Sequence, residues 1–181
     1  MDQSKLIVFS GPACSGKSTL AAQLSLELGI PHLAMDQTRA RLMPDSPHTR
    51  EDRAVAYRAM HFAAELLVGR RQSVILDAPY GHRQDRRELE AVVSRAGARL
   101  FLIECQVSPE VALERFRQRE RGPRMDLTEE RVDELVRAFR YGGQGLLLDT
   151  GSLDRDGCLA LIRQYLAAGQ PVPPGQWAGR S

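Results

Sequence analysis

A short stretch near the N-terminus has residue types and spacing that suit the binding of a polyphosphate. Gly11-Pro12-Ala13-Cys14-Ser15-Gly16-Lys17-Ser18 matches the pattern G-x-x-x-x-G-K-[S/T] at each fixed position. Gly11 and Gly16 allow a sharp turn, so that successive backbone N–H groups point at an anion. We predict that Lys17 reaches the β- and γ-phosphates of a nucleotide and that the Ser18 hydroxyl ligates Mg²⁺.

The flanking residues are those that such a loop requires. An apolar run at 6–10 reads as a buried strand, and 19–28 has leucines at helical spacing before Gly29. The chain has 25 lysines and arginines, yet Lys5 and Lys17 are its only lysines. Almost all basic residues of the chain are arginines, yet the loop has a lysine, Lys17, whose ammonium group is a compact point charge. The residues predicted to hold the nucleotide are Gly11, Pro12, Ala13, Cys14, Ser15, Gly16, Lys17, Ser18 and Thr19.

Two further apolar runs, at 30–36 and 73–77, end on aspartates, Asp36 and Asp77. The carboxyl ends of parallel strands share one edge of the sheet, so both aspartates are predicted to lie beside the loop. Asp36 is either the base for an acceptor hydroxyl or an N-cap for the next helix. Asp77 either holds Mg²⁺, directly or through water, or contacts the substrate, or is a plain turn residue.

Arginines are dense between residues 115 and 124. Arg115 and Arg119 are four apart and share one side of a helix, which Gly122-Pro123 then ends. Planar guanidinium groups suit the charge on a transferring phosphoryl group, so we predict a lid at about 112–127. The alternative is a solvated helix face.

Strands alternate with helices along the chain, which predicts an α/β fold with a parallel sheet and helices on both faces. We expect one domain at 1–170 and a Pro-rich tail at 171–181 that is extended and either packs on the surface or stays mobile. Strands are predicted at 6–10, 30–36, 73–77, 99–105 and 146–150, and helices at 19–28, 39–42, 50–70, 83–95, 109–119, from 128, and 156–168.

In the helix at 50–70, Val55 and Met60 lie at helical spacing, and Phe62 is predicted to pack in the core. Tyr57 is a candidate for the border of an acceptor pocket. His82 follows Asp77 in a loop and is either a substrate contact or a surface residue. The other histidines show no metal-ligand spacing.

Composition limits the function classes. The 181 residues are 43% hydrophobic and 27% charged, as in soluble globular proteins, and no apolar run reaches the ~20 residues that span a bilayer. The N-terminal residues predict no signal peptide. Three cysteines without paired spacing suggest free thiols in a reducing cytoplasm. A net charge of +2 predicts no general nucleic-acid binding.

Residues 5–168 resemble the small P-loop kinases related to the 5′-kinase domain of phage polynucleotide kinase, a group that includes zeta-toxin-like and chloramphenicol-phosphotransferase-like kinases. The resemblance rests on the glycine loop, on Asp36 with Arg39, on Asp77, and on Arg115 with Arg119. It implies a three-layer P-loop fold with strand order 2-3-1-4-5. It also implies ATP with Mg²⁺ as donor.

The resemblance further implies a role for each matching side chain. The position of Asp36 belongs to the general base, that of Arg39 to a residue that holds the substrate or its phosphate, and those of Arg115 and Arg119 to the lid. Pro79 departs from relatives, which often have a hydroxyl or amide residue there, so this loop's substrate contacts are less predictable.

These residues predict an ATP-dependent kinase whose acceptor is a hydroxyl of a small molecule, a nucleoside or a polynucleotide 5′ end. One alternative is a kinase that acts on a nucleotide phosphate, which needs acceptor-binding arginines but no carboxylate base. The other is a nucleotide-binding regulatory ATPase, in which Asp36 and the lid arginines would be idle. The oligomeric state is open.

Overall fold

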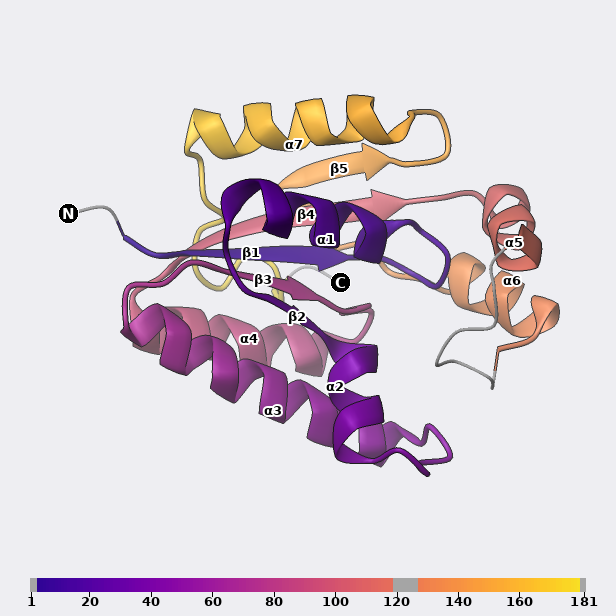
Figure 1. Ribbon diagram of the computed structural model, residues 1–181, viewed down its shortest axis with the longest axis horizontal. Coiled ribbons are helices and arrows are strands. Elements are labelled where there is room, and N and C mark those ends of the chain that lie inside the picture. Colours follow the sequence, from indigo (N-terminus) through magenta and orange to yellow (C-terminus); the bar gives the residue numbers. More distant parts are fainter. Residues whose placement is uncertain (1–2, 119–126, 180–181) are drawn as a thin grey trace.

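The computed structural model describes residues 3–118 and 127–179. Its centre is a five-stranded, fully parallel sheet with the order β2-β3-β1-β4-β5, which confirms the predicted fold class and strand order (Figure 1). The strands are β1 (Lys5–Ser10), β2 (His32–Ala34), β3 (Val74–Asp77), β4 (Arg99–Gln106) and β5 (Leu146–Asp149).

Helices cover both faces of the sheet, so the molecule has three layers (Figure 1). The helices are α1 (Lys17–Leu28), α2 (Met35–Leu42), α3 (Arg50–Gly69), α4 (Arg83–Ala96), α5 (Pro109–Gln118), α6 (Glu129–Arg137) and α7 (Arg155–Ala168). Side chains of β1 point alternately to the two faces. Leu6 and Val8 pack toward α3 and α4, whereas Ile7 and Phe9 pack toward α1 and α7.

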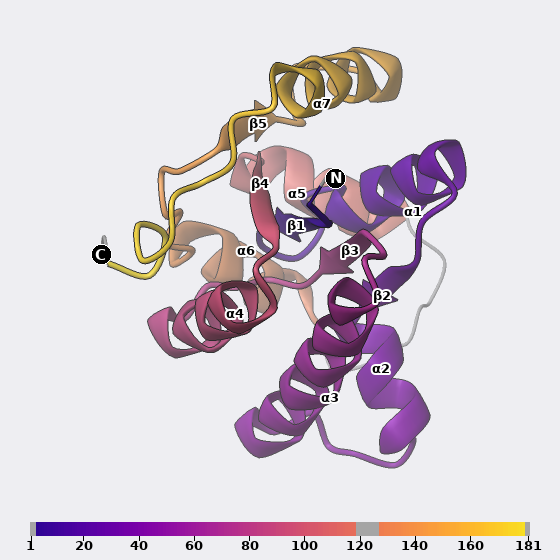
Figure 2. The same ribbon diagram turned by 90° about the vertical axis from the view of Figure 1, so that its left-hand side faces the viewer.

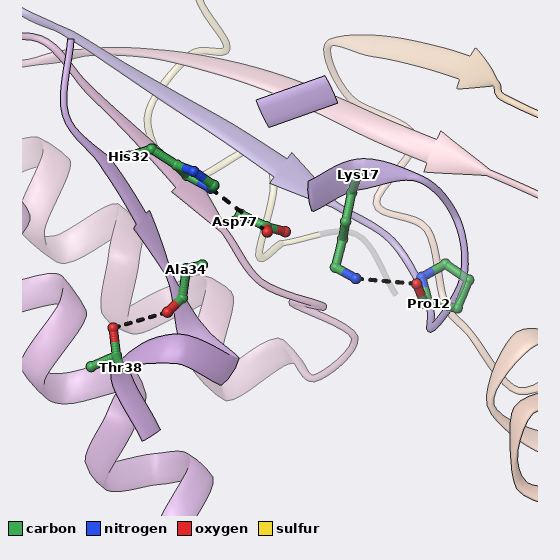
Figure 3. A network of polar contacts seen from close by, with 6 residues as sticks. All are labelled: Pro12, Lys17, His32, Ala34, Thr38 and Asp77. Atoms are coloured by element: carbon green, nitrogen blue, oxygen red, sulfur yellow. Dashed lines mark hydrogen bonds and ion pairs between the residues drawn. The ribbon is translucent and has the colours of Figure 1, made fainter. Parts of the chain in front are cut away.

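The second strand is shorter than predicted, and Asp36 lies in a helix rather than at a strand end. The last pair of the β2–β3 ladder is Ala34 with Asp77, so no residue of β3 lies opposite Met35 or Asp36. Helix α2 therefore begins at Met35, four residues before the predicted start, and the Thr38 hydroxyl donates to the Ala34 carbonyl at 2.9 Å (Figure 3).

Helix α3 has nearly the predicted bounds but a different buried face. Tyr57, Met60 and Val68 are buried, while Val55 and Phe62 are 37% and 63% exposed. The prediction that Phe62 packs in the core is therefore wrong. The helix presents another line of residues to the sheet, and that line includes Tyr57 and His61.

The C-terminal segment 171–179 is anchored in the core by Val172, Trp177 and Ala178, while its other residues are exposed; the predicted alternative of a mobile tail is therefore wrong. The backbone N–H of Val172 donates to the Leu100 carbonyl at 2.8 Å, and Trp177 is completely buried. Figure 2 shows this segment running from α7 past β5 toward α4. In the described part of the chain, no helix is both long and apolar enough to cross a membrane.

Candidate active site

A cleft of about 910 Å³ lies at the carboxyl end of the sheet. Its walls come from the glycine loop, from α2 and α3, from the β3–α4 loop, and from residues near α5, α6 and α7. The cleft brings together four predicted site residues that are far apart in sequence: Lys17, Asp36, Asp77 and Arg115.

The glycine loop has a backbone that only glycine can adopt at Gly11. This residue has φ +154°, and an added Cβ would lie 2.6 Å from the Cys105 carbonyl oxygen. The Gly11 N–H donates to the Pro79 carbonyl at 3.2 Å, which ties the loop to the β3–α4 connection. Gly16 precedes α1, and no side chain caps that helix. Its first N–H groups therefore remain available to an anion, so the loop fits a polyphosphate.

Lys17 bends back over this loop, where its ammonium donates to the Pro12 carbonyl at 3.3 Å (Figure 3). Thr19 and Ser18 follow in the first turn of α1, and both line the cleft with Lys17. A cation held by a single backbone carbonyl can turn to a phosphate without breaking an ion pair.

Asp77 is 4% exposed, and its Oδ2 lies 3.7 Å from Nε2 of His32 (Figure 3). Burial raises the pKa of this carboxyl, but the His32 imidazole, the Lys17 charge and the Ser18 hydroxyl together bring the pKa below its ordinary value. Its Oδ1 is buried and accepts no hydrogen bond in the part of the chain that the structure describes. An ionised, unsatisfied oxygen beside the Ser18 hydroxyl suits a hard cation, so the pair fits Mg²⁺.

Asp36 is the second residue of α2 and lies in the wall of the cleft. The N-cap position belongs to Ala34, and no side chain caps this helix. The alternative that Asp36 serves as the N-cap is therefore wrong. Its charge is close to Tyr57: burial raises the pKa of the Tyr57 hydroxyl, and the negative charges of Asp85 and Asp36 raise it further.

Arg39 does not reach the cleft. It is 2% exposed, is absent from the cleft wall, and lies among residues of α2 that pack on α3. Its charge acts on Asp52, whose pKa is lowered chiefly by hydrogen bonds from Ser46 and Thr49 and only slightly by Arg39. A substrate contact by Arg39 stays a prediction to which this arrangement lends no support.

The cleft wall contains arginines that the sequence analysis did not predict: three on α3, and also Arg140 after α6 and Arg155 at the start of α7. Arg50, Arg53, Ala54, Tyr57 and Arg58 line the cleft at spacings of three and four residues, so they share one face of the helix. The sequence contains this pattern as polar residues at helical spacing along α3. The prediction for this helix rested on its apolar residues instead.

Arg115 links α5 to the glycine loop. Its guanidinium donates to the Thr150 hydroxyl at 3.1 Å, to the Thr150 carbonyl, and to the Cys14 carbonyl at 3.4 Å. The Thr150 hydroxyl in turn donates to the Ser15 carbonyl at 2.8 Å. Arg119 and residues 119–126 of the predicted lid lie outside the described residues.

Two other candidates have clear positions. His82 lines the cleft and is exposed, whereas Tyr57 is 4% exposed and its hydroxyl accepts the Tyr80 N–H at 3.0 Å. Within residues 3–118 and 127–179, no three His, Cys, Asp or Glu side chains form a metal-binding group.

Comparisons with known proteins agree with this architecture. The model of the AAA domain family matches residues 6–141, which contain the glycine loop, Asp36, Asp77 and Arg115. A search of curated proteins gives no match.

Three solved structures with the same fold are kinases by description. The APS kinase of Mycobacterium tuberculosis, in complex with AMPPNP and APS, is 22% identical over 92% of this chain and 99% of that chain, with a TM-score of 0.71. A sugar kinase from Janibacter sp. HTCC2649 is 19% identical over 92% and 95%, with a TM-score of 0.69. A gluconokinase from Sinorhizobium meliloti is 17% identical over 93% and 94%, with a TM-score of 0.68.

Proposed function

The chain belongs to the AAA domain family, and on that premise we propose that it is an ATP- and Mg²⁺-dependent kinase. It transfers the γ-phosphoryl group to a hydroxyl of a small molecule, a nucleoside or a polynucleotide 5′ end. The observation that carries the proposal is the presence of Asp36 and the glycine loop in one cleft. A phosphate-binding loop alone would serve any nucleotide-binding protein, whereas a carboxylate in the same cleft serves an acceptor hydroxyl.

The nucleotide half of the cleft is built from backbone and two cations. N–H groups of the glycine loop after Pro12 and of the first turn of α1 bind the phosphates, and Lys17 neutralises charge on the β- and γ-groups. Arg115 on α5 donates to the Cys14 carbonyl of the loop and lines the cleft, and we expect its guanidinium to contact the same phosphates. Bound Mg²⁺, which Ser18 and Asp77 would hold, screens the phosphate charges.

Asp36 acts on the acceptor side. Its carboxylate accepts the proton of the acceptor hydroxyl, which makes that oxygen a better nucleophile as it approaches the γ-phosphorus. Asp36 lies in the first turn of α2, so its carboxylate extends from a helix and not from a loop.

The resemblances to sugar, gluconate and APS kinases support the proposal without naming the acceptor. The narrower likeness to polynucleotide kinase stays a prediction. Cys14, Cys105 and Cys158 are free thiols in the structure, which supports a reducing compartment such as the cytoplasm.

The deciding experiment separates nucleotide binding from transfer. We expect Asp36→Asn to bind AMPPNP with unchanged affinity in calorimetry, because the glycine loop is intact. Transfer to the acceptor, found in a metabolite screen that measures ADP release and includes a 5′-hydroxyl oligonucleotide, should fall by ~10²–10⁴.

A second candidate, a kinase that acts on a nucleotide phosphate, is favoured by the arginines of α3. Such an acceptor is already ionised and needs no base. An Asp36→Asn enzyme within a few-fold of wild type would remove Asp36 from catalysis and favour this candidate.

A further inference from the structure

The acceptor end of the cleft has a cationic wall on α3. Arg50, Arg53 and Arg58 line the cleft along one face of the helix, and Tyr57 lies beneath them, buried. The Tyr57 hydroxyl accepts the Tyr80 N–H, so this part of α3 is fixed to the β3–α4 loop. The arginines therefore extend from a helix whose position is fixed by this hydrogen bond.

The start of α3 is also fixed. Thr49 caps the helix by accepting the Asp52 N–H at 3.1 Å, and Asp52 accepts the Thr49 N–H at 3.0 Å in return. The Ser46 hydroxyl donates to the same carboxylate at 2.6 Å. Arg50 is the first residue after this cap, so its backbone position is determined.

Several exposed arginines on the outer surface form ion pairs, whereas the side chains of Arg50 and Arg53 on the cleft wall form none with the described residues. Arg95 pairs with Glu65 at 2.9 Å and Arg163 pairs with Glu27 at 3.1 Å. The guanidinium groups of Arg50 and Arg53 form no ion pair or hydrogen bond with any residue in 3–118 and 127–179.

A carboxylate faces these arginines without bridging to them. Asp85 lies in the first turn of α4, half-buried in the cleft wall, and its carboxylate makes no hydrogen bond or ion pair within the described residues. Burial raises the pKa of Asp85, Glu88 raises it further, and the charges of His82, Arg50 and Arg53 partly offset the increase. Arg50, Arg53 and Asp85 line the same cleft, so a ligand in the cleft can contact them.

From this juxtaposition we propose that the acceptor carries an anionic group, a carboxylate, phosphate or sulfate, in addition to the hydroxyl that is phosphorylated. Arg50 and Arg53 bind that group. This proposal rests on the proposed function, since it assigns the acceptor of the same cleft. Two unpaired guanidinium groups on a fixed helix match a planar or tetrahedral anion.

Charge-assisted hydrogen bonds of this kind set the size of the effect. Removal of one guanidinium group should weaken the binding of the anionic acceptor by ~10-fold to 100-fold. The neutral analogue of the same acceptor never makes these bonds, so its affinity should be unaffected.

The test uses matched probes that differ only in the anionic group: D-gluconate with D-glucitol, glycerate with glycerol, and adenosine 3′-phosphate with adenosine. Calorimetry on the full chain, saturated with AMPPNP and Mg²⁺, measures each affinity for wild type, Arg53→Ala, Arg53→Lys and Arg50→Ala. Arg163→Ala is the control, because it removes an arginine from a surface ion pair. A parallel assay with ATP measures phosphorylated product.

The proposal predicts that in at least one pair the anionic member binds ten times more tightly than the neutral one. Arg53→Ala should remove that preference, Arg53→Lys should keep part of it, and Arg163→Ala should leave it intact. Equal affinities within all three pairs, absence of binding included, overturn the proposal. So does a preference that survives Arg53→Ala and Arg50→Ala.

The parallel assay separates this proposal from the kinase proposal. An Arg53-dependent preference without any phosphorylated product leaves the anion site standing and removes the kinase. Equal phosphorylation of the neutral and anionic members removes the anion site and leaves the kinase proposal standing.

Discussion

Trp177, near the C-terminus, should be essential to the stability of the fold. Its side chain is 0% exposed, its ring centroid lies 5.2 Å from that of Tyr80, and the Arg86 guanidinium lies 5.7 Å from its ring. The backbone N–H of Trp177 donates to the buried Glu90 carboxylate at 2.9 Å. The residue thus joins the last segment of the chain to α4 and to the β3–α4 loop.

The contacts allow the size of the loss to be estimated. Trp177→Ala empties a fully buried site and should lower the free energy of unfolding by about 3–5 kcal/mol. For a chain of this length that corresponds to a Tm lower by about 6–20 °C. The indole N–H has no hydrogen-bond partner among the described residues. Trp177→Phe therefore loses only part of the ring and should cost about 1 kcal/mol.

The same substitution should reach the nucleotide site. Tyr80, which packs on Trp177, follows Pro79, and the Pro79 carbonyl accepts the Gly11 N–H and the Ser10 hydroxyl. We expect Trp177→Ala to weaken AMPPNP binding well below the unfolding temperature, while Trp177→Phe binds normally.

Thermal and urea unfolding of the two variants, with AMPPNP calorimetry at 20 °C, measures both effects. A Trp177→Ala protein within 1 kcal/mol of wild type would refute the assignment of the C-terminal segment to the core. Equal losses in the Ala and Phe variants would show that the cost is not set by ring volume.

Further substitutions test other parts of the molecule. Lys17→Ala should weaken ATP binding and abolish transfer, while Lys5→Ala, the loss of the only other lysine, should leave ATP titrations unchanged. Asp77→Asn should raise the Mg²⁺ concentration needed for half-maximal turnover, and an unchanged Mg²⁺ titration would place Asp77 outside the metal site. His61, with its pKa lowered by burial to about 4 from 6.5, stays neutral in the fold while the unfolded chain takes up a proton. The free energy of unfolding should therefore drop by roughly 3 kcal/mol between pH 7 and pH 4, and His61→Gln should flatten this dependence in Tm measurements.

The five strands and the glycine loop could be predicted because local sequence determines them, whereas the strand order 2-3-1-4-5 was implied by the resemblance to P-loop kinases. Each strand is a short apolar run, and a parallel sheet with helical crossovers allows few arrangements of five such runs. The end of β2 could not be predicted in this way. It depends on where β3 ends. Asp77, the last residue of β3, pairs with Ala34, so the residues after Ala34 have no strand to pair with.

The acceptor side was less predictable because its residues have no motif. Arg39 was expected to hold the substrate because of the resemblance to P-loop kinases, yet it is 2% exposed on a helix that packs on α3. Arg53 lies in the cleft, 17 residues after Asp36, because α2 packs on α3. Trp177 was missed for a similar reason, since one aromatic residue in a Pro-rich segment has no periodic neighbours that indicate burial.

This difference between the two halves of the cleft has a functional consequence. The nucleotide half depends on the backbone of the glycine loop, which Gly11 and the Pro79 carbonyl hold, so few substitutions are compatible with it. The proposed acceptor half consists of Asp36 on α2 and of side chains on α3 and α4, and there the guanidinium groups of Arg50 and Arg53 make no bonds to other described residues. A substitution there changes what the cleft binds without disturbing a core contact. Acceptor preference can therefore change between proteins that share this fold while the phosphate donor stays the same.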